Sequence, residues 1–131
     1  GHYYFKEFFG CDSGLLAALR ILQCVAEASA EGKSASAMVA KVNSRYANSG
    51  ELNFKVDDKD AAIARALDVA SRELPTELSR SEMDGVRIEY ATGWINIRKS
   101  NTEPYLRLII ETDTRSTLDK WINLLSAAIL N

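Results

Sequence analysis

Apolar side chains over the first third of the chain recur at a spacing typical of amphipathic helices. The spacing predicts one helix that begins at Asp12 or Ser13 and ends near Ala30. A second helix is predicted from Ser34 to about residue 48, where Asn-Ser-Gly would end it. The first helix carries a full apolar stripe that consists of Leu15, Leu16, Leu19, Leu22, Val25 and Ala26. Such a stripe is more typical of a packed surface than of a cofactor pocket.

From about residue 50 onward, segments of alternating apolar and polar residues interleave with two further helical patterns. Strands are predicted over residues 52–56, 86–90, 95–98 and 106–111, and helices over 58–74 and from Thr114 onward. Because each strand has one apolar face, the two helices would cover that face and leave the polar face free. The pattern predicts an α+β fold with an antiparallel-rich four-stranded sheet and two helices on one face, preceded by one or two helices. In the strand at residues 95–98, Arg98 alternates with the apolar residues Ile95 and Ile97, so we expect it on the free face.

A polar loop joins the last two predicted strands and runs from Arg98 to Pro104, with the sequence Arg-Lys-Ser-Asn-Thr-Glu-Pro. Arg98 offers a planar fork of donors that matches two phosphate oxygens at once. Ser100 and Thr102 add hydroxyl donors, and Asn101 can donate from its amide and tolerates a tight turn. These residues predict a phosphate-binding clamp. The alternative is a polar hairpin loop that contains a cation by chance.

Two other cations near this loop are given different roles. Lys99 points to the opposite side of its strand from Arg98 and is expected to be solvated. Arg107 is expected to pair with Glu89 or Glu111 across the polar face rather than to contact phosphate.

Composition and charge narrow the class of protein. The chain has 131 residues, of which 47% are hydrophobic, and this is enough for one core. Its formal net charge of -2 argues against nucleic acid or an anionic membrane as a partner, because those surfaces need clustered Lys and Arg. No apolar run approaches the roughly 20 residues that span a bilayer. Cys11 and Cys24 lie too far apart on one predicted helix to pair, which favours a reducing cytoplasm.

Three segments resemble motifs of one enzyme family. The sequence Arg-Lys-Ser-Asn-Thr-Glu-Pro-x-Leu-Arg at residues 98–107 resembles the phosphate-binding loop in the last domain of the α-D-phosphohexomutases, which move phosphate between C6 and C1 of a hexose. Gly-His-Tyr-Tyr-Phe at residues 1–5, followed by Phe-x-Cys-Asp-Ser-Gly at 9–14, resembles the end of that family's sugar-recognition loop and the helix start after it. Met-Asp-Gly-Val-Arg-Ile at 83–88 resembles the strand before the phosphate loop. The motifs occur in family order and span almost the whole chain.

Asn101 separates two branches of that family. The loop reads Ser-Asn-Thr, which resembles the phosphomannomutase/phosphoglucomutase branch, whereas the phosphoglucosamine mutase branch typically has Ser-Gly-Thr. The phosphoglucosamine mutase branch is the alternative, and the preference for mannose, glucose or glucosamine phosphate stays open.

The resemblance implies a role for each part of the chain. Residues 1–32 would be the tail of the third, sugar-binding domain, 33–49 a connecting helix and hinge, and 50–131 the C-terminal phosphate-binding domain, similar in fold to the TATA-box-binding protein. The loop would hold the non-reacting phosphate of a phosphohexose during 1,6-phosphate transfer, and a hexose 1,6-bisphosphate would be intermediate and activator. The phosphate ligands implied are Arg98, Ser100, Asn101 and Thr102. Gly1 and His2 would be a remnant of the sugar loop, although Gly-His is also commonly left by tag removal.

The catalytic motifs of that family do not occur in this chain. It has neither the Ser-His-Asn type of serine loop nor the Asp-x-Asp-x-Asp loop for Mg²⁺, so we expect no catalytic residue and no metal ligand here. The acidic run at residues 57–60 is interpreted as the start of a helix. We therefore expect an inactive C-terminal fragment of a full-length isomerase, without its N-terminal domains and prone to self-association through residues 12–30. The competing class is a non-catalytic, effector-binding α+β module.

Overall fold

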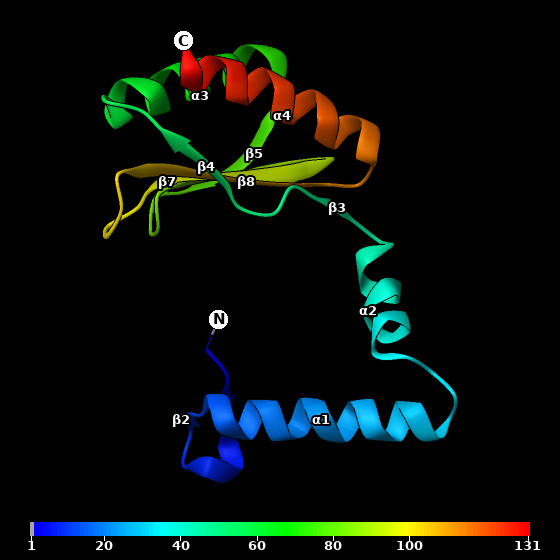
Figure 1. Ribbon diagram of the computed structural model, residues 1–131. Helices are drawn as coiled ribbons and strands as arrows, with labels where there is room; N and C mark the ends of the chain where they lie inside the picture. Colours follow the sequence, from blue (N-terminus) through cyan, green and yellow to red (C-terminus); the bar gives the residue numbers. More distant parts are fainter. Residues whose placement is uncertain (1) are drawn as a thin grey trace. The chain divides into compact units, whose positions relative to one another are not determined.

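The computed structural model describes residues 2–131, apart from the side chains of Lys41 and Val42. The chain divides into two compact units, residues 1–44 and 45–131, whose elements are drawn in Figure 1. Within the described residues, no helix is long and apolar enough to cross a membrane.

The N-terminal unit consists of a short hairpin and two helices. Its elements are β1 (Tyr4–Phe5), the 3-10 helix η1 (Lys6–Phe8), β2 (Cys11–Asp12), α1 (Gly14–Ala30) and α2 (Ala35–Asn43), and β1 pairs with β2 in antiparallel fashion. Helix α1 begins directly after Ser13, whose hydroxyl oxygen accepts a hydrogen bond from the Leu16 backbone N–H at 3.2 Å. This N-cap confirms the predicted helix start.

Most of the apolar stripe on α1 is exposed. Leu15, Leu19 and Leu22 have relative exposures of 75%, 55% and 63%, whereas the buried positions in α1 are the small residues Ala17 and Ala28. Large side chains left in water forgo the free energy of burial, so this stripe is a surface that a partner could cover.

The C-terminal unit is an antiparallel sheet covered by two helices (Figure 1). The helices are α3 (Lys59–Glu73) and α4 (Arg115–Leu130), and the strands are β3 (Ala47–Asn48), β4 (Leu52–Lys55), β5 (Glu77–Ser81), β6 (Val86–Tyr90), β7 (Gly93–Lys99) and β8 (Tyr105–Thr112). The strand order is β3-β8-β7-β6-β5, and β4 also pairs with β8, next to β3 along the same strand. The predicted α+β fold is confirmed.

The sheet has six strands rather than the four predicted. The predicted strands correspond to β4, β6, β7 and β8, and the two that were missed are β3 and β5. Every residue of β5 is exposed, so its sequence, Glu-Leu-Ser-Arg-Ser, carries no apolar alternation. Strand β3 is short, and it also explains why α2 ends at Asn43 and not near residue 48: Ala47 and Asn48 pair with Thr112 and Glu111 of β8.

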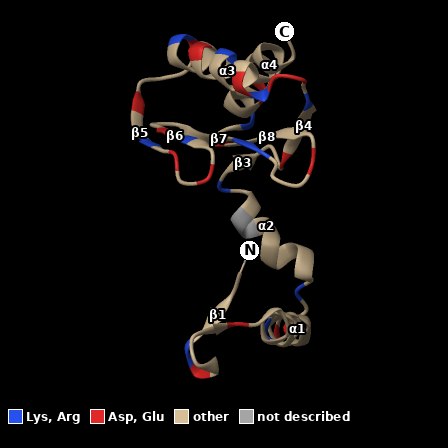
Figure 2. Cartoon of the chain, turned by 90° about the vertical axis from the view of Figure 1, so that its left-hand side faces the viewer, with Lys and Arg blue, Asp and Glu red and all other residues tan. Residues whose placement is uncertain are grey.

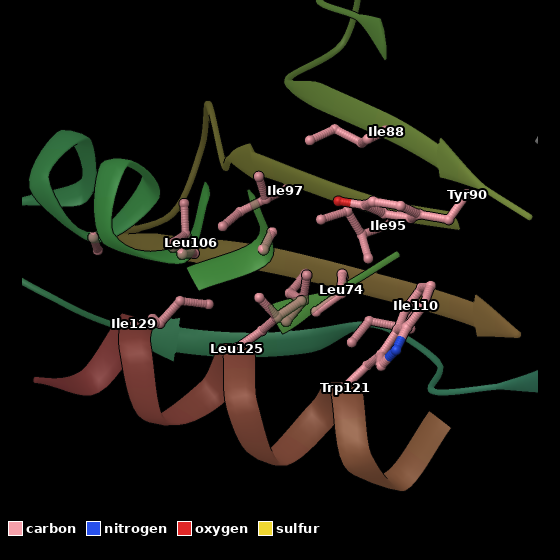
Figure 3. Packing of buried hydrophobic residues seen from close by; sticks show 14 of the residues in the cluster. Leu74, Ile88, Tyr90, Ile95, Ile97, Leu106, Ile110, Trp121, Leu125 and Ile129 are labelled. Carbon is pink, nitrogen blue, oxygen red and sulfur yellow. The ribbon is translucent and has the colours of Figure 1, made fainter. Parts of the chain in front are cut away.

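The core lies between the sheet and the two helices (Figure 3). Helix α3 contributes small residues, Ala62, Ala66 and Ala70, while α4 and the strands contribute large ones. The large residues that are almost fully buried are Ile88, Ile95, Ile97, Leu106, Leu108, Ile110, Leu118, Leu125 and Ile129. Trp121 packs edge-on against Tyr90 with ring centroids 5.1 Å apart. This packing fixes the sheet, and α3 and α4 leave its opposite face uncovered.

The free face carries the polar residues of the strands. Along β7, Ile95 and Ile97 are buried in the core while Trp94, Asn96 and Arg98 alternate with them and point the other way. Lys, Arg, Asp and Glu occur along these strands and the loops that join them (Figure 2). The prediction that Arg98 lies on the free face is therefore confirmed.

Candidate functional site

The loop between β7 and β8 is closed by hydrogen bonds between its own residues. Ser100 N–H donates to the Tyr105 carbonyl at 2.9 Å, and Glu103 N–H donates to the Ser100 hydroxyl oxygen at 3.2 Å. Ser100 is half-buried, whereas Asn101 and Thr102 are exposed. The Ser100 hydroxyl accepts within the loop and still has a proton to donate outward.

Arg98 lies on the free face where β7 meets this loop, and its side chain is 29% exposed. Its Nη2 donates to Oε2 of Glu51 at 3.2 Å, and its Nη1 lies 3.7 Å from Oδ2 of Asp84. Glu51 belongs to the connection between β3 and β4, and Asp84 to the turn between β5 and β6. Arg98 thus faces one carboxylate from each of two segments that are distant in sequence.

Arg107 lies opposite Arg98 on β8. Its Nη2 donates to Oε2 of Glu103 at 2.6 Å, and its Nε, which is buried and forms no hydrogen bond among the described residues, lies 3.5 Å from Oε1 of Glu51. The prediction that Arg107 pairs with Glu89 or Glu111 is therefore wrong. The reason is that both carboxylates have other partners.

Glu89 accepts hydrogen bonds from Arg87, at 3.2 Å and 3.1 Å. Glu111 accepts from Trp94 Nε1 at 3.1 Å and from the Asn48 side-chain amide at 2.9 Å. The Arg87 guanidinium also lies 3.9 Å above the Trp94 ring. That face of the indole is thus covered by a cation, which supports a packing role for Trp94.

Glu51 is the residue of this site that the sequence did not reveal. One of its oxygens faces Arg98 and the other faces Arg107, so it bridges the two guanidinium groups. It lies immediately before β4 and 47 positions before Arg98 in the sequence, so no local spacing relates the two residues.

The turn before β6 packs directly on Arg98. Gly85 has φ +73°, and a Cβ added there would lie closer than 3.0 Å to the Arg98 Cβ and the Ile97 carbonyl oxygen, and 2.8 Å from the Arg98 Cα. The Asn96 side-chain amide donates to the Asp84 carbonyl at 3.0 Å. Only glycine satisfies both the backbone conformation and this close approach. The turn before β6 is thus in direct contact with the backbone of Arg98.

Lys99 lies on the opposite side of β7 from Arg98. Its Nζ pairs with Oδ1 of Asp60 at 2.6 Å, and its side chain is 45% exposed. The expectation that Lys99 is solvated is confirmed, since its side chain is exposed, and the first turn of α3 in addition brings a carboxylate to it. The same turn contains Asp58, which accepts from Ala61 N–H at 2.9 Å, so the helix-start interpretation of this acidic run is confirmed.

Next to Arg98, the free face of the sheet has a shallow hollow. It is lined by Ser81, Met83, Asp84, Arg87, Trp94, Asn96, Arg98 and Ile109. A ligand held by Arg98 would therefore have polar groups of β6 and β7 within its surroundings.

Of the sugar-loop remnant, Gly1 lies outside the described residues, and His2 belongs to the N-terminal unit. His2 Nδ1 pairs with the carboxylate of Asp12, which also accepts from Tyr3 N–H at 3.1 Å. The hydrogen bond from His2, followed by that from Tyr3, lowers the pKa of the Asp12 carboxyl below its usual value. In the described part of the chain, no group of three His, Cys, Asp or Glu residues could hold a metal ion.

Comparison with known proteins places these features in a family. Residues 51–126 match the model of the phosphoglucomutase/phosphomannomutase C-terminal domain. Phosphohexose mutases from Xanthomonas campestris are 40% identical over 111 residues, which is 85% of this chain and 23% of the relative. A phosphomannomutase from Methanocaldococcus jannaschii is 38% identical over 117 residues, 89% of this chain and 24% of the relative.

A solved structure agrees with these matches. A phosphoglucomutase/phosphomannomutase family protein from Burkholderia thailandensis is similar with a TM-score of 0.65 and 26% identity. The similarity covers 98% of this chain and 26% of that one. The chain thus spans about a quarter of the length of the relatives that it matches.

Proposed function

Because the chain belongs to the phosphoglucomutase/phosphomannomutase family, whose C-terminal domain it contains, we propose that its β7–β8 loop binds the phosphate of a phosphohexose. The bound group would be the phosphate that is not reacting while the whole enzyme, a phosphomannomutase/phosphoglucomutase, transfers phosphate between the 1 and 6 positions of the sugar. A hexose 1,6-bisphosphate would be the intermediate and activator.

The position of Arg98 supports this proposal most directly. Its guanidinium lies on the free face of the sheet, partly exposed, at the end of β7 from which the loop begins. In the proposed complex Arg98 pairs with two phosphate oxygens, and Ser100 and Thr102 donate from their hydroxyls. Asn101 shapes the exposed loop and donates from its amide.

Such a clamp would assist a reaction that occurs at the other end of the sugar. Binding free energy gained at a remote phosphate can be used to hold the reacting group in position, which raises its effective concentration. The chain itself would then contribute positioning and no chemical step, and we expect it to have no mutase activity alone.

The Mg²⁺ that such an enzyme would use does not fit the described residues, since they contain no suitable group of three His, Cys, Asp or Glu side chains. We assign that ion, and the phosphorylated serine, to the N-terminal domains of the whole enzyme. We also propose a cytoplasmic location, because Cys11 and Cys24 are both free and exposed, as suits a reducing compartment.

The exposed stripe on α1 is proposed to contact the rest of the third domain in the whole enzyme. In the isolated chain we propose that the same stripe, which includes Leu15, Leu19 and Leu22, pairs with α1 of a second copy. Burial of such residues contributes roughly 1.5–3 kcal/mol each, which would drive this association.

The phosphate site can be tested by NMR titration of the chain with glucose 6-phosphate. We expect a dissociation constant near 1 mM, about -4 kcal/mol, because one domain supplies all the contacts. Amide shifts should be concentrated at residues 98–103 and should vanish in Arg98→Ala. Lys99→Ala is the matched control, since it removes a neighbouring cation whose side chain points to the other side of β7. Shifts spread over the whole domain, or retained in Arg98→Ala, would contradict the proposal.

A further inference from the structure

Both terminal nitrogens of Arg98 face a carboxylate. Nη2 is held by Glu51 at 3.2 Å, and Nη1 lies 3.7 Å from Asp84. These are the nitrogens that a phosphate would need for a two-point contact. These contacts leave N–H groups of Arg98 free, but a phosphate bound there would lie beside two negative charges. Because like charges repel, we expect at least one carboxylate to move away when phosphate binds.

We propose that Asp84 is a resident anion that phosphate displaces from Arg98, and that Glu51 stays in place as a positioning residue. This inference rests on the proposed function, because it concerns the same phosphate site. It assigns opposite roles to two carboxylates that both pair with Arg98.

Asp84 is the weaker of the two partners. Its side chain is 80% exposed, and its 3.7 Å separation from Arg98 is an ion pair without a hydrogen bond. Exposed pairs of this kind contribute little to stability, since water and salt screen them. An incoming phosphate, with up to two negative charges, competes well against one solvated carboxylate.

Glu51 is held more firmly. Its side chain is 35% exposed, it accepts a hydrogen bond from Arg98, and its other oxygen faces the buried Nε of Arg107 at 3.5 Å. Arg107 is itself anchored by Glu103 at 2.6 Å. If Glu51 left, the Arg107 guanidinium would keep Glu103, but its buried Nε would lose the carboxylate beside it, which is costly for a buried cationic group.

The backbone holds Asp84 beside Arg98. Gly85 packs against the Arg98 backbone so closely that a Cβ would not fit, and Asn96 donates to the Asp84 carbonyl at 3.0 Å. The turn is thus fixed by two contacts with β7, and the exposed side chain of Asp84 is free to turn away. We therefore expect a phosphate dianion to displace Asp84 from Arg98 more readily than a singly charged anion does.

The test measures binding of inorganic phosphate and of glucose 6-phosphate to the full chain by NMR titration. Asp84→Asn keeps the size of the side chain and removes the competing charge, so we expect roughly three- to fivefold tighter binding of both ligands. Asp60→Asn is the control, because it removes the same charge from an exposed carboxylate that pairs with Lys99 and not with Arg98. It should change the affinity by less than about 1.5-fold.

Glu51→Gln should act in the opposite direction and weaken binding, because it loosens Arg98 and Arg107 together. If Glu51→Gln tightened binding as much as Asp84→Asn, the two carboxylates would be equivalent and the assignment of roles would be overturned. If Asp84→Asn changed the affinity no more than Asp60→Asn does, the proposed displacement of Asp84 would be wrong, but the proposal of a phosphate site would be unaffected. If the binding of the unmodified chain did not depend on Arg98, as judged with Arg98→Ala, the proposed function itself would fail. Thermal unfolding of each variant confirms that it is folded.

Discussion

Substituting Gly85 by Ala tests how tightly the turn before β6 packs against β7 at the proposed phosphate site. Gly85 combines φ +73° with a contact in which an added Cβ would overlap Ile97 and Arg98 of β7. The left-handed conformation costs a residue with a Cβ roughly 1–2 kcal/mol. Relief of the overlap, by lifting the turn or bending β7, costs roughly a further 1–3 kcal/mol.

Gly50→Ala separates these two contributions. Gly50 lies in the same unit and has φ +66°, but an added Cβ there would meet no atom within 4 Å. We therefore expect Gly50→Ala to lose only the conformational part, and Gly85→Ala to be less stable than Gly50→Ala by about 1–3 kcal/mol. For a domain of this size, each 1 kcal/mol lowers the melting temperature by roughly 4–8 °C.

Urea and thermal unfolding followed by tryptophan fluorescence measure this difference, because Trp94 and Trp121, the two tryptophans of the chain, both lie in the C-terminal unit. Displacement of the turn should also move the amide resonances of Arg98 and weaken phosphate binding. Equal stability of Gly85→Ala and Gly50→Ala would show that the contact with β7 is not tight, and the argument for a fixed turn at Arg98 would fail.

Two other outcomes follow from exposure and burial. Light scattering should show self-association of the unmodified chain and a monomer for the double substitution Leu19→Glu with Leu22→Glu, since charge on the α1 stripe prevents its burial; a monomeric unmodified chain would contradict this. Burial, together with nearby Glu77, raises the pKa of Tyr90 from 10.0 to about 12. The stability that Tyr90 contributes should therefore be complete below pH 10 and be lost as the pH rises towards 12, and urea unfolding of Tyr90→Phe should lack that part of the alkaline loss. An identical alkaline profile would refute the assignment to Tyr90.

Local chemistry in the sequence determined the helices and most of the sheet. Ser13, Asp58 and Thr114 each cap a helix where the sequence predicted one, because capping needs only a side chain and the N–H groups two or three residues later. The strands β6, β7 and β8 were recognisable because apolar residues alternate along them. The same alternation placed Arg98 on the free face.

The tertiary structure alone decided which charges meet. Strand β5 is exposed throughout and forms because β6 offers it backbone hydrogen bonds, so its own residues gave no signal. Arg107 pairs with Glu103 and Glu51 instead of Glu89 or Glu111, since the partners of a charge on a sheet depend on register and on which loops fold over it. Glu51 and Asp84 reach Arg98 from connections on either side of β7 in the strand order, and no spacing in the sequence relates these connections to β7. Contacts between residues distant in sequence are set by packing of the whole domain. The sequence could therefore suggest Arg98 as a phosphate donor, but it could not reveal the carboxylates that contact Arg98.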